Sequence, residues 1–281
     1  MDAVPEHGLQ ERIRKHVRDW SVEIEHSEET GTSVLLFGHR NSRPVVLKVL
    51  RHPGDEWLSG AVLAAFEGRG AARVYEYAEG ALLLERLRPG TSLAQLALAG
   101  QDDEATGILV DVIGAMTPVS APPTTPTLLD WGQAFDRYAA AGDARIPREL
   151  VAEAQEVYAR LCRSQTQVRL LHGDLQHYNV LSDADRGWLA IDPKGVVGET
   201  EFEIGAAMRN PCEGTDAFAR PEVVERRLNR FASRLPIDRG RALSWAFAQA
   251  VLSEVWRVED GDLANEPHGL LLARVVRPML G

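Results

Sequence analysis

One short stretch past the middle of the chain limits the possible folds more than any other feature. Asn179 begins a β-type run, Ser182–Gly187 is turn-like, and Trp188–Ile191 forms a second β-type run that ends at Asp192. Two such runs around a turn predict a β-hairpin. Because a hairpin returns the chain, Asn179 and Asp192 are expected at the same open end, beside Asp174 in the preceding loop.

The spacing of these three polar residues has a chemical meaning. An aspartate followed five positions later by an asparagine is the pattern of a kinase catalytic loop. In that chemistry the aspartate faces the attacking hydroxyl, while the asparagine reaches a metal ion on the nucleotide phosphates. Asp174 is therefore the candidate catalytic residue. Asn179 and Asp192 are candidate ligands of Mg²⁺, a hard cation that takes oxygen ligands.

The first ninety residues have a β-rich pattern interrupted by one helix. Aliphatic runs at Ser33–Phe37 and Val45–Leu50 are separated by turn residues and predict a hairpin. Apolar residues at spacings of three and four predict a helix over Asp55–Phe66. Two further strands are predicted at Ala72–Tyr77 and Ala81–Leu87, which gives the order ββαββ.

Lys48 lies in the second of these strands, on an aliphatic face where an ammonium group needs a partner. Glu56, predicted at the start of the helix, is the candidate carboxylate, and such a pair would position nucleotide phosphates. Taken alone, Lys48 could be a solvated edge-strand lysine and Glu56 a helix N-terminal acid. The segment from Glu85 to Leu87 joins the two predicted lobes and could offer backbone groups to adenine.

The rest of the chain has mainly helical patterns. Four apolar stretches with helical spacing lie between residues 93 and 162, and two or three more helices are predicted between residues 221 and 280. Residues 118–126, rich in Pro, Ser and Thr, predict an extended connection. We therefore expect an α+β, bilobal fold: a small β-rich N-lobe over residues 1–87 and a larger, mainly helical C-lobe over residues 88–281.

The order of these features resembles the aminoglycoside/hydroxyurea phosphotransferase family, and more narrowly its streptomycin 6-kinase-like members. The resemblance rests on Lys48, Glu56, His172-x-Asp174, Asn179 and Asp192, and on the runs Ala190–Glu199 and Arg209-Asn210-Pro211. It implies a protein-kinase-like fold, ATP and Mg²⁺ as cofactors, and transfer of the γ-phosphoryl group to a hydroxyl of a small molecule. The implied acceptor is an aminoglycoside such as streptomycin, with hydroxyurea or an endogenous sugar or amino-alcohol as alternatives.

Two departures from the protein-kinase pattern narrow the substrate class. Asp192 is followed by Pro193-Lys194-Gly195 in place of Phe-Gly, and no Ala-Pro-Glu motif follows, so protein substrates are disfavoured. The glycine-rich loop is reduced to Gly31. The alternative from another class is a nucleotide-binding pseudokinase or regulatory module, which the intact set of charged residues argues against.

Acidic and aromatic side chains of the predicted C-lobe are candidates for binding the acceptor. They are Glu199, Glu201, Glu203, Trp131, Trp256 and Asp260. The three glutamates could line a pocket for a guanidino or amino sugar, although a run of charges is usually a solvated face. The two tryptophans could equally belong to the core, and the aspartate to a surface turn.

Charge and composition exclude some partners. The net charge of −10 and a pI near 5.3 make nucleic acid an improbable partner, and slightly favour a cationic small molecule. The N-terminal residues lack a signal-peptide pattern, and no segment approaches the roughly 20 apolar residues of a membrane span. We expect a cytoplasmic enzyme without a membrane or nucleic-acid partner, as a monomer or weak homodimer.

Overall fold

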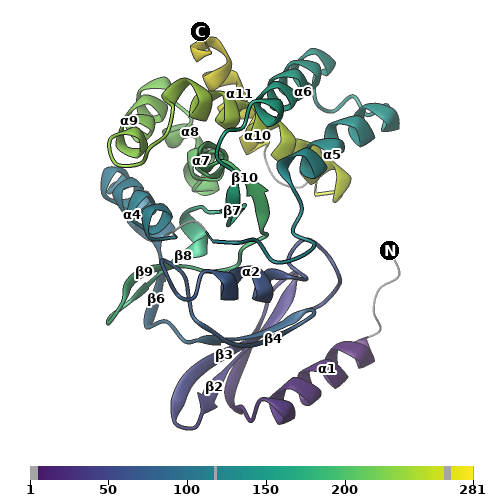
Figure 1. The fold of residues 1–281 in the computed structure, drawn as a ribbon, viewed down its shortest axis with the longest axis vertical. Helices are drawn as coiled ribbons and strands as arrows, with labels where there is room; N and C mark the ends of the chain where they lie inside the picture. The colour runs from purple at the N-terminus through teal and green to yellow at the C-terminus, as the bar shows by residue number, and fades with distance from the viewer. Residues whose placement is uncertain (1–5, 117–118, 263–266, 281) are drawn as a thin grey trace.

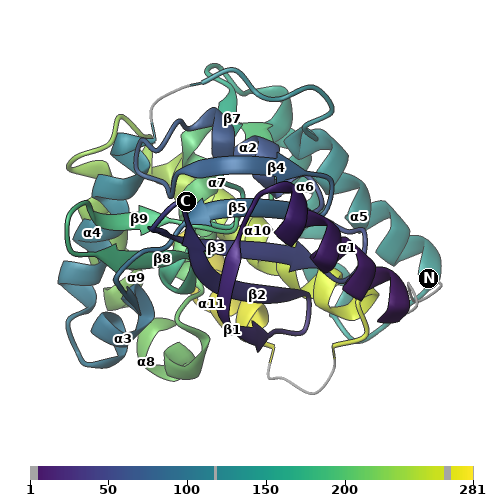
Figure 2. The same cartoon turned by 90° about the horizontal axis from the view of Figure 1, so that it is seen from below.

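The computed structural model describes residues 6–116, 119–262 and 267–280 (Figure 1). A β-sheet with one helix on its outer side occupies one end of the molecule, and most of the helices lie beyond it. Viewed from the sheet end, the strands and α1 lie in front of the helical part (Figure 2). The expected arrangement of a small β-rich part and a larger helical part is confirmed.

The N-terminal part consists of one helix followed by a five-stranded antiparallel sheet with a second helix. Its elements are α1 (Glu6–Asp19), β1 (Glu23–Glu29), β2 (Ser33–Arg40), β3 (Arg43–Leu50), α2 (Ser59–Ala65), β4 (Val74–Ala78) and β5 (Ala81–Glu85). The strand order is β1-β2-β3-β5-β4. Helix α1 was not predicted, whereas the β2–β3 hairpin was and is confirmed.

Strand β5 contributes to two separate hydrophobic cores. Ala81 and Leu83 face the core beneath α1, whereas Leu82 and Leu84 join the large core that continues into the helical part. The alternation arises because successive side chains of a strand point to opposite faces. Beyond Glu85 the chain leaves this sheet, and the predicted boundary between residues 87 and 88 falls in the connection that follows.

The predicted helix over Asp55–Phe66 is too long. Helix α2 begins only at Ser59, and Glu56 lies in the turn before it. The backbone of Trp57 is used elsewhere, since its carbonyl accepts a hydrogen bond from Gly80 N at 3.1 Å in the β4–β5 turn. This hydrogen bond to a distant turn takes the place of the helical bonding that was predicted before Ser59.

The C-terminal part has two small sheets surrounded by helices. Strands β6 (Pro89–Ser92), β8 (Val180–Asp183) and β9 (Gly187–Ala190) form one sheet, and β7 (Arg169–Leu171) pairs with β10 (Val196–Gly198). The helices are α3 (Leu93–Leu98), α4 (Asp102–Ala115), α5 (Leu128–Ala141), α6 (Arg148–Arg163), α7 (Thr200–Met208), α8 (Thr215–Phe218), α9 (Pro221–Ala232), α10 (Arg239–Glu259) and α11 (His268–Val276). Short 3₁₀ turns cover His177–Asn179, Cys212–Gly214 and Arg277–Met279.

Helix α10 organises this part, since it packs against α5, α6, α7 and α11. The predicted extended connection starts outside the described residues at Pro118, and the described residues 119–126 contain neither helix nor strand. Within the described part of the chain, no helix combines the length and apolar character that crossing a membrane requires.

Candidate active site

The predicted hairpin around the polar triad is confirmed. Strands β8 and β9 are antiparallel, with Val180 opposite Ala190. At the open end, Ile191 N donates to the backbone oxygen of Asn179 at 2.9 Å, and Asp192 follows directly. Asp192 has a φ of +56°, an uncommon conformation for a residue other than glycine that frequently occurs at functional sites.

Asn179 also contacts the loop that carries Asp174. Its side-chain nitrogen donates to the backbone oxygen of Asp174 at 2.9 Å and lies 3.5 Å from the carboxylate oxygen Oδ2. With the nitrogen used in this way, the amide oxygen of Asn179 is the atom left for a cation. The fold thus brings Asp174, Asn179 and Asp192 to one end of a single hairpin.

Lys48 extends this group of charges into the N-terminal sheet. It lies on β3 and is buried, and its Nζ is 2.7 Å from Glu56 Oε2 and 2.9 Å from Asp192 Oδ1. Burial alone would lower the pKa of Lys48, but the carboxylates of Asp192 and Glu56 outweigh it and raise the pKa overall. Lys48 is therefore a fixed cation that joins the two parts of the molecule.

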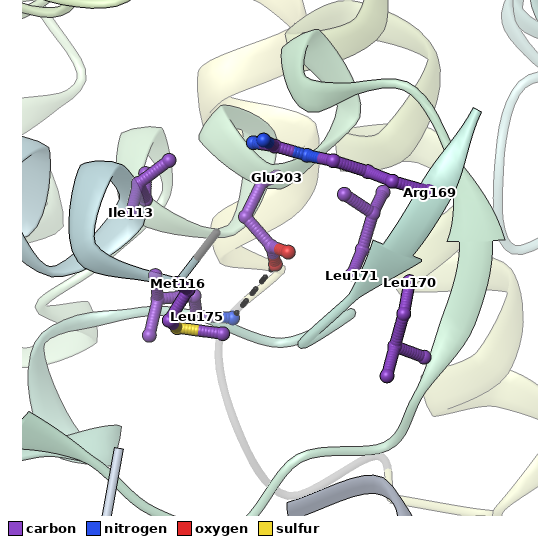
Figure 3. A pocket seen from close by; sticks show the side chains of 7 residues that line it. All are labelled: Ile113, Met116, Arg169, Leu170, Leu171, Leu175 and Glu203. Atoms are coloured by element: carbon purple, nitrogen blue, oxygen red, sulfur yellow. Dashed lines mark hydrogen bonds between the residues drawn. The ribbon is translucent and has the colours of Figure 1, made fainter. Parts of the chain in front are cut away.

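The backbone of the loop before Asp174 is held by a buried carboxylate. Glu203 of α7 accepts hydrogen bonds from the backbone N–H groups of His172 at 2.8 Å, Gly173 at 2.9 Å and Leu175 at 3.4 Å. Figure 3 shows Glu203 directed at Leu175 N in the small cavity beneath the loop. Burial raises the pKa of Glu203, against the opposing effect of His172 and the backbone N–H groups.

His172 ties the loop to the hairpin. Its Nε2 lies 2.7 Å from the backbone oxygen of Ile191, and its Nδ1 accepts from Asp174 N at 3.3 Å. These partners require the tautomer with hydrogen on Nε2. The ring therefore connects the backbone of Asp174 to the residue that precedes Asp192.

Arg209, at the end of α7, contacts Asp174 directly and was not predicted as a site residue. Its Nη2 lies 3.3 Å from Asp174 Oδ1, and its Nη1 donates to Gln249 Oε1 at 2.9 Å. Burial lowers the pKa of Arg209, although Asp174 and Glu254 oppose this. The only sequence signal was its position in the Arg209-Asn210-Pro211 run of the resemblance.

Part of the backbone in the connection between the two parts is already bonded within the protein. Glu85 N already donates to Arg73 O at 3.0 Å, and the Glu85 carboxylate binds the side chain of Arg186. Arg86 N donates to Pro44 O at 3.3 Å. The N–H groups of Glu85 and Arg86 are thus taken by the protein itself, whereas contact of the Leu87 backbone with a nucleotide stays a prediction.

The three glutamates proposed for the acceptor have internal partners instead. Glu199 is buried and binds the side chains of Arg241 and Trp245, whereas Glu203 holds the loop described above. Glu201 accepts from the backbone nitrogen of the residue before α10 at 3.1 Å. The prediction that they line an acceptor pocket together is wrong, because they connect elements of the C-terminal part.

Of the other acceptor candidates, the two tryptophans lie together, beside the loop of Asp174. The rings of Trp131 and Trp256 meet edge to face, with centroids 5.3 Å apart. Trp131 lies against the loop, since a Cβ on Gly173 would be 2.7 Å from its Cη2. Asp260 ends the helix that carries Trp256 and is exposed.

Comparison with known proteins places this site in a family. The sequence model of the family described as aminoglycoside/hydroxyurea antibiotic resistance kinase matches residues 19–261. Streptomycin 3″-kinase from Klebsiella pneumoniae is 39% identical over 237 residues, which cover 83% of this chain and 86% of that protein. Streptomycin 6-kinase from Streptomyces griseus is 29% identical over 290 residues, which cover 96% of this chain and 89% of that protein.

A solved structure shows the same fold. It is the ternary complex of a thermostable mutant of aminoglycoside phosphotransferase APH(4)-Ia with AMP-PNP and hygromycin B. Its TM-score is 0.67 at 17% identity, with 95% of this chain and 98% of that chain covered. The fold is thus protein-kinase-like. From the family match and these relatives, the chain belongs to the aminoglycoside/hydroxyurea antibiotic resistance kinases and is a small-molecule kinase that phosphorylates an alcohol group.

Proposed function

We propose that the protein transfers the γ-phosphoryl group of ATP, with Mg²⁺, to a hydroxyl of a cationic aminoglycoside such as streptomycin. The observation that carries the proposal is the bridge from Lys48 to Glu56 and Asp192, formed beside the pair Asp174 and Asn179. Phosphoryl transfer needs little covalent chemistry from the protein, so catalysis rests on positioning and charge. The fixed charges of this arrangement support such a role.

The donor atoms suit a magnesium ion held together with phosphates. Among the described residues, no group of three His, Cys, Asp or Glu side chains could hold a metal ion alone. Asp192 and Asn179 nevertheless offer a carboxylate and an amide oxygen at one end of the hairpin, and Mg²⁺ is commonly bound by one or two protein oxygens plus substrate phosphates. When bound there, the ion would neutralise phosphate charge.

The chain's own residues would divide the remaining tasks. Asp174 would orient the acceptor hydroxyl and take its proton late, because a loose transition state requires little early deprotonation. Arg209 holds Oδ1 of Asp174 at 3.3 Å, whereas Oδ2 has only the long contact to the Asn179 side chain at 3.5 Å, so Oδ2 would face the acceptor. Lys48 would reach the phosphates, while Glu56 and Asp192 fix the position of its ammonium group.

Streptomycin is the first acceptor to test, because three relatives bear streptomycin kinase names. The net charge of −10 is in keeping with a cationic acceptor. Trp131 lies against Gly173, the residue before Asp174, and Trp256 contacts Trp131, which supports these two residues, with Asp260 at the end of the same helix as Trp256, as contacts of the acceptor. Hydroxyurea, which the family description names, is the second acceptor.

The test compares wild type with Asp174→Asn by measuring ADP release and the mass increase of the acceptor in the presence of Mg·ATP. We expect the variant to bind nucleotide as wild type does and to lose transfer by about 10²- to 10⁴-fold. Asp185→Asn, in the exposed β8–β9 turn, is the control and should transfer normally. Full turnover by Asp174→Asn would refute the assignment, and absence of transfer by wild type would favour the pseudokinase alternative.

A further inference from the structure

A lysine that no part of the proposed mechanism uses lies two residues after Asp192. Of the 31 lysines and arginines in the sequence, only three are lysines: Lys15, Lys48 and Lys194. Lys15 forms a surface ion pair with Asp19 on α1, and Lys48 belongs to the buried bridge. Lys194 is the remaining lysine, and its positive charge has no role in the proposed mechanism.

The ammonium group of Lys194 faces an aromatic ring and a carboxylate. Its Nζ lies 5.3 Å from the centroid of the Trp256 ring and 3.4 Å from Asp55 Oδ2. The contact to Asp55 crosses from the C-terminal part to the turn after β3. Asp260 follows Trp256 by four positions, at the end of α10. Partial burial and then the negative charge of Asp55 raise the pKa of Asp260, whereas the positive charge of Lys194 opposes this. One aromatic face and one acid therefore contact this cation, and the charge of a second acid, Asp260, acts on it from the end of α10.

The backbone at Lys194 is fixed, whereas the ion pair of its side chain is weak. Gly195 has a φ of +80°, and a Cβ there would lie 2.4 Å from Val62 Cγ2, so the segment packs tightly against α2. Gly195 N also donates to His172 O at 2.9 Å. In contrast, the partner Asp55 has a side chain that is 73% exposed, so its pair with Lys194 is weak.

This group of side chains has the chemistry of a receptor for an organic cation. An aromatic face attracts ammonium and guanidinium groups, and neighbouring carboxylates add charge attraction. Its location fits the acceptor, because Trp256 contacts Trp131 and Trp131 lies against Gly173, the residue before Asp174. A cationic group bound here would place the rest of the acceptor near the catalytic aspartate.

We propose that Trp256, Asp55 and Asp260 form the subsite for a guanidinium or ammonium group of the acceptor, and that Lys194 occupies this subsite until the acceptor displaces it. The proposal rests on the proposed function and deepens it. Lys194 would thereby favour cationic acceptors. The cationic group of such an acceptor makes the same contacts with Trp256 and the two acids that Lys194 gives up. A neutral molecule makes no such contacts, so it cannot displace Lys194.

The first test measures streptomycin affinity by calorimetry. Lys194→Met removes the internal competitor, so we expect streptomycin to bind about threefold to tenfold more tightly than to wild type. Lys194→Arg keeps a cation in place and is the matched control, with affinity close to wild type. Trp256→Leu removes the aromatic face and should weaken binding by about threefold or more. A Lys194→Met variant that binds no more tightly than Lys194→Arg would overturn the proposal.

The second test observes the displacement itself. Reductive methylation with ¹³C-formaldehyde labels accessible lysines and keeps their charge. The Lys194 signal should be shifted by the Trp256 ring and should move toward the position of a free lysine as streptomycin is added. Lys15, 58% exposed in its side chain and on α1, is a control within the same molecule and should not move.

The two readouts separate this proposal from the proposed function. Movement of the Lys194 signal without any phosphoryl transfer would support the cation subsite while refuting the kinase assignment to this acceptor. Transfer to streptomycin with the Lys194 signal fixed at saturation would do the opposite, since it would overturn the displacement and leave the phosphotransfer in place.

Discussion

Replacing Glu203 tests whether a buried carboxylate holds the loop that carries Asp174. Glu203→Ala leaves three backbone N–H groups without their acceptor, two of them bonded at 2.8 and 2.9 Å and the third at 3.4 Å. An unsatisfied buried donor costs about 1–3 kcal/mol. Counting two full bonds and one weak one, we expect a loss of about 3–6 kcal/mol, a large share of the roughly 5–15 kcal/mol of a typical domain.

Glu203→Gln separates the bonds from the bulk of the side chain. The amide keeps one acceptor oxygen, but its NH₂ group must face backbone donors. The variant also avoids burying a charge, and this offsets part of the loss, so we expect about half the effect of alanine, roughly 1–3 kcal/mol. Glu201→Gln, two residues earlier on α7, keeps an amide oxygen for its single accepted bond of 3.1 Å and should cost about 1 kcal/mol or less.

Urea unfolding of the three variants, followed by circular dichroism, measures these losses as changes in midpoint at constant slope. Turnover with Mg·ATP should fall together with stability in both Glu203 variants, because the same N–H groups position Asp174. Equal midpoints for Glu203→Gln and Glu201→Gln would refute the reasoning, since the buried carboxylate would then contribute no more than a half-exposed one.

Three further predictions concern the framework around the site. Asp102→Asn leaves the buried guanidinium of Arg227 without its charge partner and should cost about 3–5 kcal/mol in urea unfolding, with part of the loss recovered when Arg227→Met is added. Gly173→Ala places a Cβ at a residue with a φ of +84° and against the indole of Trp131, whereas Gly187→Ala places one at a φ of +76° in open space. Gly173→Ala should therefore lower the melting temperature and the turnover more than Gly187→Ala does. Burial raises the pKa of the Cys162 thiol to about 11, which reduces its thiolate, so iodoacetamide at pH 8 should label it roughly a hundredfold more slowly in the folded protein than in urea; equal rates would contradict this.

The parts of the fold that could be predicted are those with a local pattern. The hairpin of Asn179 and Asp192 followed from two β-type runs and turn residues, and the pair of Lys48 and Glu56 followed from a charge on an apolar face. Both are local signals that tertiary contacts reinforce. The helix before Phe66 was predicted too long because Trp57 is bonded to a distant turn, which no local pattern records.

Helix α7 shows why the rest could not be predicted. Its residues from Phe202 to Met208 are all buried, so the helix has no polar face and gives no amphipathic signal. Its glutamates therefore resembled a solvated run of charge. One signal was present in the spacing: residues two apart on a helix do not share a face, so the side chains of Glu201 and Glu203 were to be expected on different sides of it.

The two-faced strand β5 has a practical consequence for engineering. An exchange of the small lobe for that of a relative would cut the chain near residue 87. The transferred strand β5 would then carry side chains for two different hydrophobic cores, one on each of its faces. Leu83 would travel with its own surroundings, whereas Leu82 and Leu84 would meet a foreign helical core. Hybrid enzymes of this family should therefore tolerate the exchange only when those two positions are matched to the recipient.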